Sequence, residues 1–158
     1  VLVEARPRIL GPAANSAAII DCYLPGPIGG EAFADILFGS VSPSGRLPFT
    51  YPAYTGDIGV NYYHLYSAVT SPLYPFGHGL SYTNFQYSSL TASSVWNLQT
   101  SPHFTISVTV TNNGFVQADE VVLLFLSDLY CTVAPAVKRL RRFSRINLHP
   151  GITQTVSW

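Results

Sequence analysis

The spacing of apolar positions changes along the chain and predicts its secondary structure. Residues 17–24 (AAIIDCYL) form a short, nearly continuous apolar run, typical of a parallel strand covered on both faces. Residues 31–38 (EAFADILF) place apolar side chains at helical spacing, and Gly39 offers a stop. Residues 25–30 (PGPIGG) between them predict a tight turn. This part of the chain therefore predicts a strand, a turn and a helix, with residues 1–3 as the candidate for a second strand.

The middle of the chain shows no regular period. Residues 40–82 are rich in Pro, Gly, Ser and Tyr, and no helical or alternating pattern persists long enough to support an element. We expect an extended connector there.

The last third of the chain has the period of β-strands. Apolar and polar residues alternate over 104–111 (FTISVTVT), which predicts a strand with one buried face. Asn112-Asn113-Gly114 is a turn signal. Further strands are expected at 121–126, which is apolar on both faces, at 143–148, and at 153–158 after the turn Pro150-Gly151. Short strands at this spacing favour an antiparallel sandwich.

Charge is scarce. Of the 158 residues, 47% are hydrophobic and 10% are charged, against about 25% charged in ordinary soluble domains. Eight basic residues balance eight acidic ones, so the chain lacks the field that attracts nucleic acid or a charged membrane surface. No apolar run is long enough for a membrane span. We therefore expect neither nucleic acid nor membrane as a partner.

Candidate metal and redox residues are dispersed. Cys22 and Cys131 fit no metal-ligand or redox spacing; we expect two unreactive thiols, with a disulfide between them as the alternative. The four His, at positions 64, 78, 103 and 149, show no short spacing that would bring two onto one metal. The sequence contains no Met and no Gly-x-Ser-x-Gly motif. We expect no cofactor and no metal.

Two carboxylates stand at a spacing that resembles a catalytic pair. Retaining glycosidases use two carboxyl groups about 5 to 5.5 Å apart, and Glu31 and Asp35 lie one turn apart on the expected helix. Such a pair needs environments that separate the two pKa values, and one helix face provides a single environment. Asp119 and Glu120 open a strand, so their side chains point to opposite faces. We interpret all four as structural.

Basic and aromatic residues supply the other candidate contacts. Five of the eight basic residues lie within 138–145, and no Asp, Glu, Lys or Arg occurs in 58–118. The basic cluster either holds an acidic glycan or a partner's carboxylates, or is the solvated face of a strand pair. Aromatic residues crowd the connector, where they either stack on sugar rings or anchor the connector itself. The residues that we single out as glycan or interdomain contacts are Tyr62, Tyr63, Tyr66, Arg139 and Arg141.

Five segments, in order, resemble the C-terminal part of glycoside hydrolase family 3, which contains β-glucosidases and β-xylosidases. The resemblance extends over nearly the whole chain from about Ile19, and the run NYYHLYSAVTSPLYPFGHGLSYT looks closer to the β-xylosidase branch. The five segments are LPGPIGGEAFADILFGSVSPSGRLPFTYP (24–52), PLYPFGHGLSYTNFQYS (72–88), VTVTNNG (108–114), DEVVLLFLSD (119–128) and VKRLRRFSRINLHPG (137–151).

The resemblance implies a three-part enzyme with a (β/α)₈ barrel, an α/β sandwich that carries the acid/base Glu, and a fibronectin type III-like domain. A barrel alone takes about 250 residues, so these 158 residues cannot contain it, and none of their carboxylates matches a catalytic position. We expect a C-terminal fragment that is itself non-catalytic and structural, from a parent that hydrolyses β-glycosidic bonds. The alternative is a stand-alone β-sandwich module that binds carbohydrate or protein.

The resemblance also divides the chain. We expect a mixed fold: the remnant of an α/β sandwich in residues 1–52, an aromatic-rich extended connector in 53–84, and an incomplete antiparallel, fibronectin type III-like sandwich in 85–158. Arg142 stands where the family usually has Gly, and the chain stops before the family's final strand. Implied partners are the missing barrel and sandwich domain, in the same or a separate chain, and β-linked glycans; family resemblance alone suggests an extracellular, lysosomal or vacuolar location.

Overall fold

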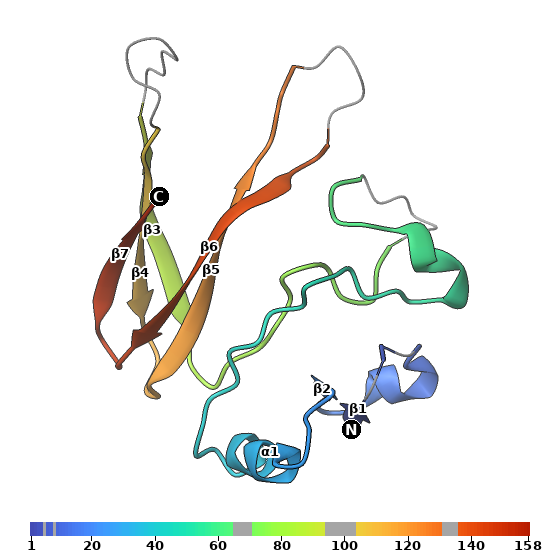
Figure 1. The fold of residues 1–158 in the computed structure, drawn as a ribbon. Helices are drawn as coiled ribbons and strands as arrows, with labels where there is room; N and C mark the ends of the chain where they lie inside the picture. The colour runs from blue at the N-terminus through green and yellow to red at the C-terminus, as the bar shows by residue number, and fades with distance from the viewer. Residues whose placement is uncertain (5, 8, 65–70, 94–103, 131–135) are drawn as a thin grey trace. The chain divides into compact units, whose positions relative to one another are not determined.

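The computed structural model describes residues 1–4, 6–7, 9–64, 71–93, 104–130 and 136–158 (Figure 1). These residues form two compact units. The first unit comprises Val1–Val41, Arg46–Gly79 and Phe125–Arg139; the second comprises Ser42–Gly45, Leu80–Leu124 and Leu140–Trp158.

The first unit contains a pair of parallel strands, β1 (Leu2–Glu4) and β2 (Ile20–Tyr23), separated in sequence by a short 3₁₀ helix, η1 (Gly11–Asn15). Parallel pairing confirms the expected α/β character. Strand β2 is shorter than the predicted run of residues 17–24. It ends at Tyr23, whose φ of +51° lies in the left-handed region, where a strand cannot continue.

Helix α1 (Gly29–Leu37) begins two residues before the predicted start. The prediction of a turn over 25–30 was therefore wrong in its last two residues, because both glycines belong to the first helical turn. Gly29 is buried, and a Cβ there would clash with the Pro25 side chain. At the other end Gly39 adopts a φ of +82° and its N–H donates to the Ile36 carbonyl, so the predicted glycine stop is confirmed.

The connector is more ordered than its irregular sequence predicts. Residues 55–59 form a second 3₁₀ helix, η2 (Thr55–Gly59). Tyr51 and Tyr74 form an antiparallel β-bridge, and backbone hydrogen bonds of 2.8 Å also join Leu47 to His78 and Gly77 to Leu47. Two distant stretches thus run side by side, held by backbone groups that leave no periodic trace in the sequence.

The second unit contains a three-stranded antiparallel sheet in the order β3-β4-β7. Strand β4 (Ile106–Asn112) confirms the alternating pattern, since every second residue from Ile106 is buried; Phe104, expected on the same face, lies before the strand and is exposed. Strand β7 (Thr153–Ser157) lies where predicted. Strand β3 (Phe85–Ala92) was not predicted, because only Phe85 among its residues is turned away from solvent.

Strands β5 (Ala118–Leu126) and β6 (Arg139–Leu148) form the second sheet. Side-chain contacts join Gln117 to Asn147, and Ser127 to the Val137 carbonyl. Residue number therefore rises along one strand as it falls along the other, so the pair is antiparallel. The prediction had this strand starting at Phe143; β6 in fact starts at Arg139 and includes every residue of the basic cluster except Lys138.

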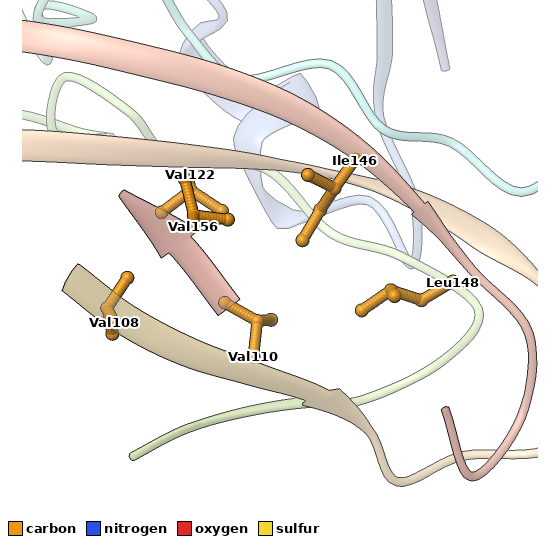
Figure 2. Close-up of a cluster of buried hydrophobic side chains, with 6 residues drawn as sticks. All are labelled: Val108, Val110, Val122, Ile146, Leu148 and Val156. Carbon is orange, nitrogen blue, oxygen red and sulfur yellow. The ribbon is translucent and has the colours of Figure 1, made fainter. Parts of the chain in front are cut away.

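The hydrophobic core lies between these two sheets (Figure 2). Figure 2 shows side chains from β4 and β7 facing side chains from β5 and β6. Phe85 and Trp158, both partly buried, pack against them. The core is entirely aliphatic, as the alternating Val and Ile positions predict. Its members are Val108, Val110, Val122, Ile146, Leu148 and Val156.

A fully buried amide closes one end of this core. The Asn112 side chain accepts hydrogen bonds from the Thr83 hydroxyl at 2.6 Å and from the Gly114 N–H at 3.1 Å. Its Nδ2 donates to the carbonyls of Val116 at 2.8 Å and Leu148 at 2.9 Å. The predicted turn at 112–114 therefore exists, but Asn112 acts in it as the last strand residue and as a tie between four backbone or hydroxyl groups.

Candidate functional site

The described carboxylates are engaged in local structure. Glu31 and Asp35 are both exposed on α1. Asp57 Oδ2 accepts the Tyr54 N–H at the start of η2, and Glu120 Oε1 accepts the Tyr87 hydroxyl at 2.6 Å inside the sandwich. Asp57 thus serves a helix start and Glu120 a partly buried contact, whereas Glu31 and Asp35 face solvent on one helix; the structural interpretation of Glu31 and Asp35 stays a prediction.

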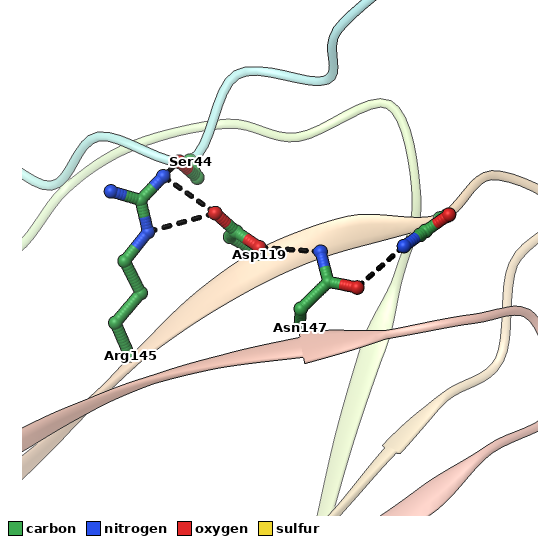
Figure 3. A network of polar contacts seen from close by, with 5 residues as sticks. Ser44, Asp119, Arg145 and Asn147 are labelled. Carbon is green, nitrogen blue, oxygen red and sulfur yellow. Dashed lines mark hydrogen bonds and ion pairs between the residues drawn. The ribbon is translucent and has the colours of Figure 1, made fainter.

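Asp119 and Glu120 leave opposite faces of β5, as predicted. Asp119 lies on the outer face, where it pairs with Arg145 and accepts the Asn147 amide at 2.5 Å (Figure 3). Arg145 also donates to the Ser44 hydroxyl at 3.1 Å. The hydrogen bond from Asn147, followed by that from Arg145 and its charge, lowers the pKa of Asp119 below its ordinary value, although partial burial opposes this. Asp119 on β5 thus binds Arg145 and Asn147 on β6, and we call these three residues the staple between the two strands.

Sequence-predicted contact residues meet in an aromatic cluster of the first unit. Tyr62 stacks on Phe76 with ring centroids 4.3 Å apart, and both rings meet Phe125 edge to face, at about 6 Å. Lys138 Nζ lies 4.9 Å from the Phe125 ring centre. The cluster anchors the connector to the segment around Lys138.

The other predicted contact residues fall into three places. The Tyr63 ring contacts the Tyr62 ring edge to face. Arg139 makes a cation–π contact with Tyr63, with its guanidinium carbon 5.7 Å from the Tyr63 ring centre. Arg141 is exposed on β6 in the second unit. Tyr66 lies outside the described residues. The structure thus brings together Tyr62, Tyr63 and Arg139.

A cavity of about 610 Å³ opens beside this cluster, wholly within the first unit. Thr50, which lines it, is 9% exposed, and its Oγ1 has no hydrogen-bond partner. Burying a hydroxyl without a partner costs about 1–3 kcal/mol. The aromatic lining residues are Phe49, Tyr54, Tyr62, Tyr63 and Phe76; the polar ones are Thr50, Thr55, Asp57 and Asn61; the rest are Pro7, Ile9, Pro48, Pro52 and Val60.

A second buried polar group surrounds Tyr23, which the sequence analysis did not single out. Burial, with the nearby Asp21 carboxylate adding to it, raises the pKa of the Tyr23 hydroxyl to about 12. The Tyr23 hydroxyl and Asp21 Oδ2 are buried without hydrogen-bond partners. The sequence signal that could have pointed to this buried group is Asp21, an aspartate inside the apolar run of residues 17–24. The hydroxyl stays protonated at neutral pH, so it can donate a hydrogen bond but cannot act as a base.

In the part of the chain that is described, the structure shows no assembled site for a metal ion or for redox chemistry. No three His, Cys, Asp or Glu side chains converge there in a way that could hold a metal ion. Cys22 is partly buried on β2, whereas Cys131 and His103 lie outside the described residues, so the alternatives for the two cysteines stay open. Among these same described residues, no helix combines the length and apolar character that a membrane crossing requires.

Known proteins are similar in sequence to this chain over its whole length. A lysosomal β-glucosidase of Dictyostelium discoideum is 50% identical and a β-xylosidase of Formosa agariphila is 36% identical, each aligned over 100% of this chain. The same alignments span 21% and 23% of those proteins, so the chain spans about a fifth of the length of these relatives.

Solved structures share its fold. A β-glucosidase from Erythrobacter marinus, 38% identical, superposes with a TM-score of 0.90 over 99% of this chain and 22% of its own.

Family comparison covers both units. Residues 1–82 match the glycosyl hydrolase family 3 C-terminal domain, and residues 120–158 match the fibronectin type III-like domain. The first match alone covers more than half of the chain. A part with parallel strands and a helix, followed by two antiparallel sheets, agrees with these two domains. The chain belongs to glycosyl hydrolase family 3.

Proposed function

We propose that this chain is a non-catalytic part of a β-glycosidase, in which it supports the catalytic portion. The whole protein would hydrolyse β-glycosidic bonds of β-glucosides or β-xylosides. The relatives named as β-glucosidase and β-xylosidase support this substrate class. The observation that carries the proposal is that the match extends over the whole chain but over only about a fifth of those enzymes.

The carboxylates support the non-catalytic part of the proposal. Retaining glycosidases place one carboxyl group as nucleophile and one as acid/base on either side of the scissile bond. Glu31 and Asp35 share one exposed helix surface, which offers no contrast between the surroundings of the two groups, as a nucleophile and an acid/base require. Asp119 is held by Arg145 and Asn147. None of these three carboxylates has an opposed partner.

Exposed apolar side chains around α1 agree with the proposal that this chain packs against the catalytic portion. Leu24, Ile28 and Phe38 are 84%, 72% and 83% exposed. Large apolar side chains that are this exposed can mark a place covered by another part of a protein when they gather on one surface. We assign it to the catalytic portion of the same enzyme.

Hydrolysis assays test the proposal in two arms. The purified chain is expected to show no turnover of aryl β-glucosides or β-xylosides above buffer. A chimera, in which this chain replaces the matching fifth of the Dictyostelium enzyme, is expected to keep β-glucosidase activity. Turnover by the isolated chain that disappears in Glu31→Gln or Asp35→Asn would contradict the first arm; a folded but inactive chimera would contradict the second.

A further inference from the structure

We propose that Asn113 is a site of spontaneous deamidation, which the folded second unit restrains by holding the turn around this residue. Asn113-Gly114 is the one Asn-Gly pair in the sequence. Glycine after asparagine favours the reaction, because a residue without a Cβ leaves its backbone nitrogen open to attack and lets the backbone bend. This modification goes beyond the proposed function and does not depend on it.

The reaction needs no enzyme and no reactant other than water. The backbone nitrogen of Gly114 loses its proton to hydroxide and attacks Cγ of the Asn113 side chain. A bond forms between this nitrogen and Cγ, and the bond from Cγ to Nδ2 breaks, so that Nδ2 takes a proton from water and leaves as ammonia. Water then opens the resulting cyclic imide at either of its two carbonyls. One opening gives aspartate; the other gives isoaspartate, in which the main chain runs through the side-chain carboxyl group and is longer by one carbon.

Hydrogen bonds in the folded chain hold the groups that must move. The Gly114 N–H, which carries the attacking nitrogen, donates to Asn112 Oδ1 at 3.1 Å. The exposed Asn113 side chain donates through Nδ2 to Gln86 Oε1 at 2.6 Å. The Asn113 N–H donates to the Asn84 carbonyl at 2.8 Å. Attack requires the Gly114 nitrogen to be released and Cγ to approach it, so Asn113 reacts from conformations in which this turn has opened.

The two products should differ in their effect on the fold. Aspartate has the shape of asparagine and can accept a hydrogen bond from the Gln86 amide group. Isoaspartate inserts an atom into the main chain directly before Gly114, which packs so closely against Thr83 that a Cβ there would clash with it. The insertion would also pull the Gly114 N–H away from the fully buried side chain of Asn112. Isoaspartate should therefore destabilise the second unit, whereas aspartate should be tolerated.

Two matched substitutions test the restraint without disturbing the core. Gln86 is exposed and holds the Asn113 side chain. Gln86→Ala frees that side chain, so deamidation should become about threefold faster. Gln117, also exposed, donates to the side chain of Asn147 at 2.5 Å. Gln117→Ala breaks a bond of the same kind elsewhere and should leave the rate at Asn113 unchanged.

The experiment incubates the 158-residue chain at mildly alkaline pH, in native buffer and in urea that unfolds it. Pepsin digestion in acid, where the imide scarcely forms, precedes chromatography and mass spectrometry, which separate the three forms of the peptide that contains Asn113. Deamidation in native buffer should be at least about tenfold slower than in urea, because opening the turn costs free energy. In urea, Asn113 should react faster than Asn15, which precedes Ser16. Asn113→Gln should abolish the reaction, since its longer side chain would have to close a larger ring.

Chains that have acquired isoaspartate are then separated from the aged sample, and their unfolding in urea is compared with that of fresh protein. The midpoint should fall by on the order of 1 M for isoaspartate and stay nearly unchanged for Asn113→Asp. An unchanged midpoint for isoaspartate would remove the predicted damage to the second unit.

Three further results would overturn the proposal. No deamidation at Asn113 in the unfolded chain would remove the site itself. Equal rates in the folded and unfolded chain would show that the turn does not restrain the reaction. Equal acceleration by Gln86→Ala and Gln117→Ala would show that the hydrogen bond to Gln86 is not part of the restraint. None of these measurements involves a glycoside, so their failure is separate from failure of the turnover assay.

Discussion

Two neighbouring asparagines show how far context decides the role of a residue. Asn112 is fully buried, and its side chain makes hydrogen bonds to Thr83, Gly114, Val116 and Leu148. Asn113, next in the chain, is exposed and donates to the Gln86 side chain. Because an unsatisfied buried polar group costs more than a hydrogen bond contributes, the two positions should respond very differently to the same change.

The substitution Asn112→Asp replaces the Nδ2 donor by an oxygen that faces the carbonyls of Val116 and Leu148. We expect the free energy of unfolding in urea to fall by about 2–4 kcal/mol, since two carbonyls lose their donor and a charge is buried. Asn113→Asp is the matched control and should cost less than about 0.5 kcal/mol. Equal losses for the two variants would show that Asn112 is not the tie that the structure indicates.

Residues of this kind lie at the limit of what a sequence can reveal. The reading of Asn112 to Gly114 as a turn is correct, but no pattern indicates that the first asparagine is buried. Tyr23 depends on a ring contact with Phe49, which is distant in sequence, and on burial beside the carboxylate of Asp21, two residues before it. The predicted contacts Tyr62, Tyr63 and Arg139 do lie together in space. They could be singled out because aromatic crowding and charge clustering are visible in the sequence. Whether they contact a glycan stays a prediction.

Secondary-structure elements were predictable where burial is periodic. Strand β4 buries one face, and helix α1 turns Phe33 and Ile36 partly away from solvent, so the spacing of both elements appears in the sequence. Strand β3 and the paired stretches around Tyr51 and Tyr74 are held by backbone hydrogen bonds, which any residue except proline can make. Those elements leave no pattern to read.

The staple between β5 and β6 should contribute stability that depends on pH. The folded pKa of Asp119 is lowered, chiefly by the Asn147 hydrogen bond and then by Arg145. A lowered folded pKa means that the contribution is complete above the unfolded value and is lost as pH falls through the folded one. The loss in stability caused by Asp119→Asn should therefore be constant above about pH 5 and shrink toward about pH 3.

A double-mutant cycle measures this contribution in urea unfolding. Coupling between Asp119→Asn and Arg145→Gln should be below about 1 kcal/mol at neutral pH, and added salt should weaken it, because the pair lies at the surface. Arg141→Gln, on the same strand, is the matched control and should show no coupling to Asp119. A coupling that does not weaken at all as the pH falls far below the ordinary aspartate pKa of about 3.9 would rule out the carboxylate as its source.

The two units of the molecule differ in how completely their strands are covered. Strand β4 lies between β3 and β7, and alternate residues along it are buried. Strand β2 has β1 as its partner, and all four of its residues are partly exposed. A parallel strand is normally covered on both faces. The exposed apolar residues around α1 agree with the proposal that the first unit packs against another part of the protein.

Amide hydrogen exchange should reveal this difference across the whole chain. Exchange from the core of a unit requires its cooperative opening, whereas a strand with one partner and no buried residue opens locally. We expect amides of residues 20–23 to exchange at least about tenfold faster than those of 106–112, after correction for intrinsic rates. Strand β3, which has one neighbour but belongs to the sandwich, should be intermediate. Protection of β2 equal to that of β4 would mean that the parallel pair is stable without further cover, and would remove the support that its exposure gives to the proposed docking of a catalytic portion.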